Sequence, residues 1–284
     1  MLRFCPVSLI LSALLLTLAL VPVSRAQPPE SSKAAAAGVP EQRGAGPTGW
    51  QTELGIGVIV NPESVGGADY RLFPVPYFDF RYLDDKGTRF FANIPQGIGG
   101  YLHRNRDFTS GRFFNIAASI APGFNVRNDD IPGLKEVNIA TEARLSVETG
   151  GRQWTANATL AQDIGSGHEG MYLDLSAARR GRVGSAGGFY AVGPVLRLGD
   201  SSYKDSLFAI TPAESVSSGL PQYTAGAGLE RLGLQGLLTL PVGQSRWRWT
   251  GIARASRLID NAADSPVVED KTQLFVLMSI TRRF

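Results

Sequence analysis

The segment Gly165-Ser-Gly-His-Glu-Gly170 has the residue types and spacing most suggestive of a chemical site. It fits the G-x-G-x-x-G pattern of dinucleotide-binding loops. Such a loop needs a strand before it, a helix after it and an acidic residue about 20 positions further on. A strand pattern lies on each side of this segment and no helix pattern follows it. We therefore interpret residues 165–170 as a hairpin turn.

The two histidines, His103 and His168, limit the possible catalysis. A hydrolase built on a barrel would need a serine, a histidine and an orienting group on neighbouring strands. Ser166 and Glu169 flank His168, but all three fall within one turn, and the chain has no G-x-S-x-G segment. Two histidines do not make a metal site. The sequence thus predicts no catalytic residue, no cofactor and no metal, and an enzyme is a distant third alternative.

The C-terminal segment Val276-Leu-Met-Ser-Ile-Thr-Arg-Arg-Phe284 alternates with a period of two. One face carries mainly apolar residues and the other mainly polar ones. The apolar face consists of Val276, Met278, Ile280 and Phe284, and the polar face of Ser279, Thr281 and Arg283. A chain that ends on an aromatic residue inside such a strand is typical of a bacterial outer-membrane barrel. We therefore expect Phe284 to serve as an assembly signal read by the barrel assembly machinery. The alternative is the last strand of a soluble sandwich.

The N-terminal residues 1–26 have the features of a secretory signal peptide. Arg3 precedes an apolar stretch over residues 7–23, and Val23-Ser-Arg-Ala26 predicts cleavage after Ala26. The apolar stretch is short for a membrane-spanning helix. Cys5 is the only cysteine and lies within the signal, so the processed chain would have no disulfide and no thiol chemistry.

The composition of the remaining chain agrees with a single cell-envelope domain. The chain has 28 Lys and Arg against 25 Asp and Glu, and removal of the signal brings the two closer to balance, so we expect no nucleic-acid partner. Residues 27–49, rich in Pro, Ala, Ser and Gly, predict a flexible periplasmic tail. Residues 50–284 would then form one β-barrel domain.

The body of the chain reads as one strand after another. In residues 136–148, apolar positions such as Val137, Leu145 and Val147 alternate with charged ones such as Glu142 and Arg144. The other runs that alternate or resemble strands are 51–60, 77–82, 88–94, 112–121, 153–162, 170–178, 188–198, 203–210, 223–231, 234–240 and 246–254. Glycine-rich and Asp/Asn-rich turns separate them. The prediction is an all-β fold, an antiparallel up-and-down transmembrane β-barrel of about 12 strands.

Charges in the middle of the strands favour a barrel over a sandwich. A barrel in lipid needs an apolar outside and tolerates a charged, hydrated inside. The candidate inward-facing charged residues are Asp79, Arg81, Glu142, Arg144, Arg197, Arg246 and Arg248. They could line a narrow aqueous pore, or they could pair with one another and fill the lumen.

Three segments resemble the MipA/OmpV family. They are Leu54-Gly-Ile-Gly-Val with Gly67-Ala-Asp-Tyr-Arg-Leu-Phe-Pro-Val-Pro-Tyr77, the stretch from Tyr203 to Gly228 that contains Ser218-Gly-Leu-Pro-Gln-Tyr223, and Arg257-Leu-Ile-Asp-Asn-Ala-Ala-Asp-Ser-Pro-Val-Val268. Together they extend over residues 51–284 in matching order. Arg282 departs from the family, which usually has Tyr there. The resemblance implies an outer-membrane protein that interacts with a lytic murein transglycosylase and links it to a murein synthase.

The expected function is thus a non-catalytic scaffold in the outer-membrane lipid, with a small-solute or ion channel as the alternative. The segment 212–222 is too polar and Pro-rich to continue a lipid-facing strand. We expect it to form a partner-binding or lumen-closing element, with Glu214, Ser218 and Tyr223 as its polar contacts.

Overall fold

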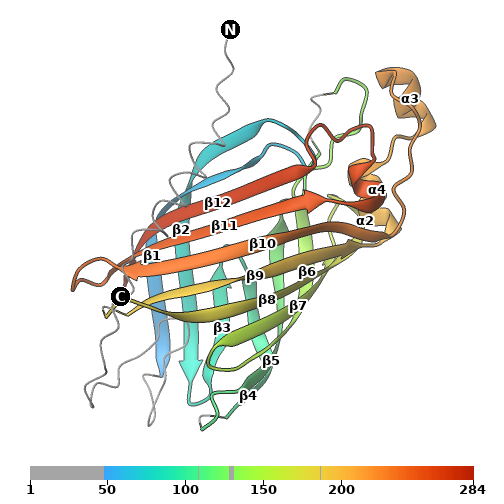
Figure 1. Ribbon diagram of the computed structural model, residues 1–284. Helices are drawn as coiled ribbons and strands as arrows, with labels where there is room; N and C mark the ends of the chain where they lie inside the picture. The colour runs from blue at the N-terminus through green and yellow to red at the C-terminus, as the bar shows by residue number, and fades with distance from the viewer. Residues whose placement is uncertain (1–47, 108, 128–130, 186) are drawn as a thin grey trace. The chain divides into compact units, whose positions relative to one another are not determined.

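The structure, a computed structural model, describes residues 48–107, 109–127, 131–185 and 187–284. Over these residues, twelve antiparallel strands form a closed barrel, in which each strand pairs with its sequence neighbour and the last strand pairs with the first (Figure 1). Closure gives every strand two neighbours, as lipid requires. The predicted fold and number of strands are confirmed. The predicted signal peptide, and the tail up to residue 47, lie outside the described residues.

The strands are β1 (Gly49–Pro62), β2 (Tyr70–Asp84), β3 (Gly87–Asn93), β4 (Gly97–Arg106), β5 (Phe113–Gly123), β6 (Ala140–Gly150), β7 (Trp154–Asp163), β8 (Met171–Val183), β9 (Gly188–Gly199), β10 (Gly228–Pro241), β11 (Trp247–Leu258) and β12 (Thr272–Arg283). The short β3 pairs with β2 only over residues 79–84 of β2. Three short helices lie in the connections: α2 (Ser201–Phe208), α3 (Pro212–Ser218) and α4 (Asp260–Ala263). None of the helices in the described part of the chain is long and apolar enough to cross a membrane.

The closing pair β1–β12 shows how the wall is built. Ile56 pairs with Ile280, and both side chains lie on the outer face, where Ile56 is 70% exposed. Ser279 and Thr281 alternate with them on the inner face and are 3% and 1% exposed. An apolar outside with a polar inside is the arrangement expected in a lipid bilayer.

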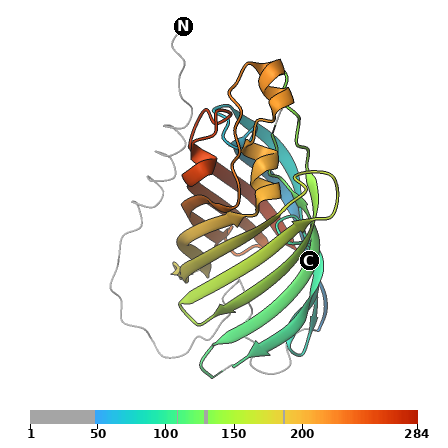
Figure 2. The ribbon, with the colours of Figure 1, turned by 90° about the vertical axis from the view of Figure 1, so that its right-hand side faces the viewer.

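The two ends of the barrel differ in their connections. The longer connections, 63–69, 124–139, 164–170, 200–227 and 259–271, and the short 94–96 all lie at one end, called here the loop end. The connections 85–86, 107–112, 151–153, 184–187 and 242–246 lie at the other, called here the turn end, together with the start of β1 and the C-terminus. Figure 2 shows the three helices gathered at the loop end.

Some strand predictions were wrong in detail. Residues 203–208 belong to α2 and not to a strand. β4 was not predicted, and 223–231 and 234–240 are not two strands, because a single strand, β10, runs from residue 228 to 241. Residues 136–139 precede β6, although an isolated bridge joins Val137 to Arg127.

Candidate functional site

A packed cluster of side chains, called here the cap, lies at the loop end, and α2 is its centre. The side chain of Asp200 accepts a hydrogen bond from the Tyr203 backbone N–H and caps the start of this helix. Tyr203, Leu207 and Phe208 are fully buried there. They form one apolar cluster with residues of the wall and of neighbouring loops: Val137, Ala161, Tyr172, Ala225, Leu258, Ala262 and Ala263.

A second, polar layer of the cap is organised by Arg197 on β9. Its Nε and Nη2 donate to the two carboxylate oxygens of Asp174, both at 2.6 Å. Its Nη1 donates to Asn125 Oδ1 and to the Tyr203 hydroxyl, at 2.6 and 2.9 Å. The guanidinium also lies 4.0 Å from the centre of the Tyr172 ring. Arg197 thus joins two strands of the wall, a loop and α2.

Glu142 on β6 is the third part of the cap and is completely buried. Its Oε2 accepts hydrogen bonds from Arg144 Nε and from the Tyr172 hydroxyl, both at 2.8 Å. Its Oε1 lies 3.1 Å from Nε2 of His168, which is also completely buried. The Glu142–His168 pair therefore faces protein on every side and presents no group to a substrate.

The hairpin prediction for residues 165–170 agrees with their position between β7 and β8. The Gly170 backbone N–H donates to His168 Nδ1, which leaves Nε2 as the ring nitrogen that bonds Glu142. A Cβ at Gly170 would lie 2.1 Å from the Tyr203 nitrogen. Glycine is needed at position 170 because the hairpin packs directly on α2.

Glu214 ties α3 to the rest of the cap. It forms a capping box with Thr211 at the start of α3. Its Oε1 also accepts hydrogen bonds from Arg127 Nη2, at 2.7 Å, and from the Lys135 backbone N–H, at 2.9 Å. Burial alone would raise the pKa of Glu214, but these hydrogen bonds and the charge of Arg127 outweigh it, and the pKa lies below its ordinary value of 4.5.

Ser218 and Tyr223 also make contacts within the loop end. The Ser218 hydroxyl donates to the Glu214 carbonyl at 2.6 Å, within α3. The Tyr223 hydroxyl donates to the Asn261 carbonyl in α4 at 2.6 Å. Glu214 and Tyr223 therefore each hold one part of the cap to another, whereas the hydrogen bond of Ser218 stays within α3.

The predicted lumen charges do not form one network. Arg81 bonds Asp79 on β2, and Arg144 bonds Glu142 on β6. Arg197 bonds Asp174, which was not predicted.

The two remaining predicted arginines lie near the β10–β11 turn. Arg248 is on the inner face of β11, paired in register with Thr281, and Arg246 is exposed in the turn itself.

The C-terminal Phe284 lies just beyond β12 at the turn end. Its backbone N–H donates to the Thr52 carbonyl at 2.9 Å, and its ring is 61% exposed. The guanidinium of Arg282 lies 5.2 Å from the centre of this ring, a cation–π contact. The residue that departs from the family pattern thus supports the terminal aromatic.

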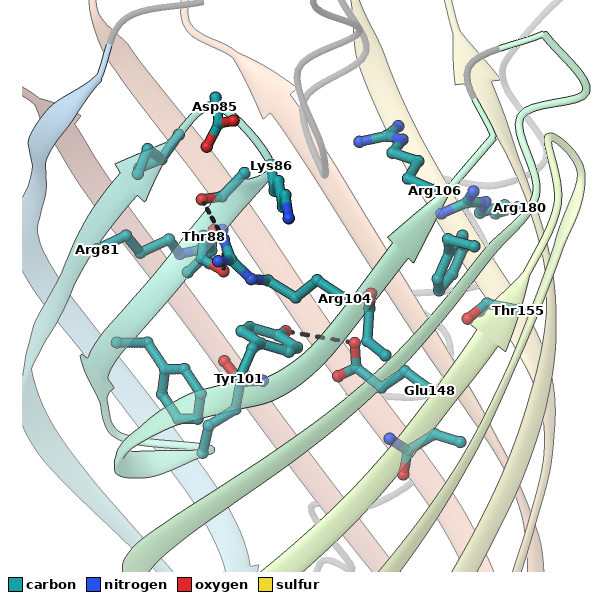
Figure 3. A pocket seen from close by; sticks show the side chains of 17 residues that line it. Arg81, Asp85, Lys86, Thr88, Tyr101, Arg104, Arg106, Glu148, Thr155 and Arg180 are labelled. Carbon is teal, nitrogen blue, oxygen red and sulfur yellow. Dashed lines mark hydrogen bonds between the residues drawn. The ribbon is translucent and has the colours of Figure 1, made fainter.

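A cavity of about 330 Å³ lies at the turn end, where the cap does not reach (Figure 3). Its lining comes from the inner faces of β2 to β8, from the β2–β3 turn and from Gln96 in the β3–β4 connection. Arg104 crosses it and bonds both carboxylate oxygens of Asp84, at 2.6 and 2.7 Å. The Tyr101 hydroxyl donates to Glu148 at 3.3 Å. Arg106 and Arg180 lie together at one side (Figure 3).

The two ends of the barrel differ in their balance of basic and acidic residues. The comparison includes the connections at each end and the three strand residues that border each connection. The basic residues of the turn end are Lys86, Arg89, Arg104, Arg106, Arg112, Arg152, Arg182, Arg246, Arg248, Arg282 and Arg283, and its acidic residues are Asp84, Asp85, Asp107 and Glu148. The described acidic residues of the loop end are Glu63, Asp69, Glu136, Glu142, Asp163, Glu169, Asp200, Asp205, Glu214, Glu230, Asp260, Asp264, Glu269 and Asp270, and its basic residues are Arg71, Arg127, Lys135, Arg197, Lys204, Arg257 and Lys271. The turn end is therefore electropositive and the loop end electronegative.

Comparison with known families identifies the chain at the family level. Residues 54–284 match the family described as MltA-interacting protein MipA. The chain belongs to the MipA family. This confirms the resemblance found in the three sequence segments. No curated protein matches the chain.

The MipA family is named for an interaction and not for a reaction. In the described part of the chain, no group of three or more His, Cys, Asp and Glu side chains is placed to hold a metal ion. The polar groups that do converge, around Glu142 and Arg197, are enclosed by the cap.

Several residues of this MipA-family barrel were missed by sequence reasoning. His168 was assigned only to a turn, and Tyr203 to a strand, although both pack against Tyr172 in the cap. Asp174 lies on the inner face of β8, and alternation alone could have placed it there. No sequence signal indicates that it meets Arg197.

Proposed function

We propose that this protein is a non-catalytic barrel of the outer membrane that serves as a scaffold for enzymes of murein synthesis and hydrolysis. The observation that carries the proposal is the match to the MltA-interacting protein family over residues 54–284. MltA is a murein transglycosylase, so the partners would be a lytic transglycosylase and, through it, a murein synthase. The closed twelve-stranded barrel with an apolar outer face supports the membrane location.

The cap supports a scaffold over the alternative, a solute or ion channel. Tyr203, Leu207 and Phe208 fill the loop end, and the Glu142 and Arg197 clusters tie them to the wall. A path for solute would require these contacts to break. Glu214 and Tyr223 take part in the same packing, which favours a lumen-closing role for segment 212–222 over a partner site.

The turn end is the surface that we assign to the murein enzymes. In outer-membrane barrels the short turns face the periplasm and the longer loops face outward. The turn end has the shorter connections and both ends of the barrel chain. Since murein enzymes act in the periplasm, they would meet this electropositive end, and the tail predicted over residues 27–49 would leave from it.

Capture of a purified lytic murein transglycosylase by the detergent-solubilised barrel tests the assignment. The turn-end variant carries Arg182→Glu and Arg246→Glu, two exposed sites, and the matched loop-end variant carries Glu136→Lys and Asp264→Lys, also exposed. We expect the turn-end variant to lose most of the capture and the loop-end variant to keep it. The assignment fails if the wild type captures no transglycosylase, or if only the loop-end variant loses capture.

Planar-bilayer conductance tests the alternative. The wild-type barrel should give no steady conductance, because the cap closes the loop end. Replacement of residues 213–219 by a Gly-Ser linker should leave a folded, heat-modifiable barrel and permit conductance to appear. A stable conductance of the wild type would favour the channel.

A further inference from the structure

We propose that the turn-end cavity binds a small organic anion, whose carboxylate or phosphate group is held by Arg180. This goes beyond the scaffold role, because it concerns a ligand inside the barrel and not a protein at its rim. The proposal rests on the contacts of the charged residues that line the cavity, on its size and on the chemistry of its other walls.

Arg180 has a positive charge that the described protein does not neutralise. Its Nε and Nη2 both donate to the Gly151 carbonyl, at 3.1 and 2.5 Å. Its guanidinium lies 5.3 Å from the centre of the Phe113 ring. No carboxylate of the described residues lies within ion-pair distance of it. These contacts fix the group in place and leave its charge for a ligand.

Arg106 adds to the positive electrostatic potential around Arg180. It lies on β4, near the end of β8 that carries Arg180, and its charge acts directly on Arg180. Figure 3 shows the two side chains side by side at one edge of the cavity. Two neighbouring guanidinium groups repel each other, and an oxyanion that accepts hydrogen bonds from Arg180 would reduce that repulsion.

The other arginines of the cavity differ in this respect. Arg104 is matched by Asp84 through two hydrogen bonds, and Arg81 by Asp79. Their charges are already used within the protein. The side around Arg180 is therefore the part of the cavity in which an arginine charge is left for an anion.

The rest of the lining suits a polar organic body. Phe91 and Tyr101 stack edge to face at 5.7 Å, and the amides of Gln96, Asn115 and Asn157 also line the cavity. Its volume of about 330 Å³ is at the lower end of the range of about 300–1,000 Å³ for ligand pockets. It therefore fits a ligand of sugar or short-peptide size.

Glu148 sets the orientation of such a ligand. Its carboxylate lines the cavity and is bonded by the Tyr101 hydroxyl. A second anion would be repelled there, whereas a hydroxyl or amide N–H would be accepted. The ligand should thus place its anionic group at Arg180 and its hydrogen-bond donors toward Glu148.

Two sources would supply this chemistry, a carboxylate such as that of a murein peptide fragment and the phosphate of a sugar phosphate. Isothermal titration calorimetry of the full-length protein in detergent distinguishes them. The probes are N-acetylmuramyl-L-alanyl-D-isoglutamine, glucose 1-phosphate and, as the neutral reference, N-acetylglucosamine. We expect one of the two anionic probes to bind, and the neutral sugar to bind at least about tenfold more weakly.

Three variants locate the site. Arg180→Gln should weaken anion binding by about tenfold or more, since it removes a charge-assisted contact. Arg152→Gln, at an exposed turn-end arginine outside the cavity, should leave binding unchanged. Glu148→Gln should strengthen anion binding, and it provides an independent test if Arg180→Gln fails to fold as judged by heat-modifiability. The proposal is overturned if neither anion binds, if the neutral sugar binds equally well, or if Glu148→Gln and Arg180→Gln both leave binding unchanged.

Discussion

The loop end and the turn end are built on the same twelve strands, yet their interiors differ. At the loop end, Glu142 and Arg197 are buried and paired within the cap. At the turn end, a cavity persists and basic residues exceed acidic ones. Inner-face positions carry polar residues at both ends of the barrel, so the strands alone do not determine which end is filled. The long connection between β9 and β10 supplies the helix that fills one end, and the short turns supply nothing comparable.

This difference implies that the loop end of the lumen contributes mainly to stability and the turn end mainly to recognition. Paired and buried charges contribute to a unique packing and are costly to disturb, because removing one partner leaves the other buried and unpaired. Charges beside an open cavity are hydrated and cost little to change. Substitutions at the loop end should therefore affect folding, while those at the turn end should affect binding.

Glu142 and Glu148 give the largest expected contrast, since both lie on the inner face of β6. Glu142→Leu should destabilise the barrel by about 3–5 kcal/mol, because Arg144, His168 and Tyr172 lose their shared acceptor. Glu148→Leu removes one long hydrogen bond and should cost about 1 kcal/mol or less. Urea unfolding in detergent micelles measures both. Equal losses would mean that the two ends are not energetically distinct.

Leu145, between those two glutamates but on the outer face, tests whether the contrast is confined to the lumen. Leu145 is 45% exposed on the wall, and Leu145→Arg should destabilise the barrel in lipid by about 2–4 kcal/mol. Ser146→Arg, at the adjacent inner position, is the matched control and should cost less. Unfolding in lipid vesicles compares them. A reversed order would place the register of β6 off by one residue, which exchanges its two faces.

The sequence predicted the wall well because lipid imposes a simple requirement on every second residue. The outer residues of β2, β6 and β12 are apolar for that reason, and their alternation is easily read. β4 was missed because Gly97-Ile-Gly-Gly-Tyr101 shows no alternation and a bulge interrupts its pairing between Tyr101 and His103. The strand count came out close to twelve because the omission of β4 offset one of two extra runs, which arose from the division of β10 and the misreading of α2.

The interior could not be predicted to the same degree. Residues 203–208 read as a weak strand, yet the buried residues Tyr203, Lys204, Leu207 and Phe208 follow a helical spacing on one face. Asp200 caps that helix, a signal that was available in the sequence. The pairing of Arg197 with Asp174 depends on which residues of β8 and β9 face each other, and alternation does not fix that register. The cavity is a consequence of side-chain packing and left no sequence pattern.

Acidification should loosen the part of the loop end that Glu214 holds together. The pKa of Glu214 is lowered in the folded protein, so its contribution to the cap is present at neutral pH and is lost as the pH falls through that lowered value. The expected loss is about 1–2 kcal/mol. Hydrogen exchange of residues 131–137 and 209–220 should accelerate at acidic pH. Glu214→Gln should show the faster exchange already at neutral pH, whereas Glu136→Gln, at an exposed site of the same end, should not.

The smallest expected effect on stability concerns the C-terminus at the turn end. Deletion of Phe284 removes one backbone hydrogen bond to Thr52 and the cation–π contact with Arg282. These losses should lower stability by only about 1 kcal/mol. Assembly should suffer more, because the terminal aromatic would no longer be available to the assembly machinery. Arg282→Tyr, which restores the residue usual in the family, keeps Phe284 and should assemble normally. Outer-membrane fractions of cells that express the three forms provide the measurement, and equal levels of the deletion variant and the wild type would show that Phe284 is not an assembly signal.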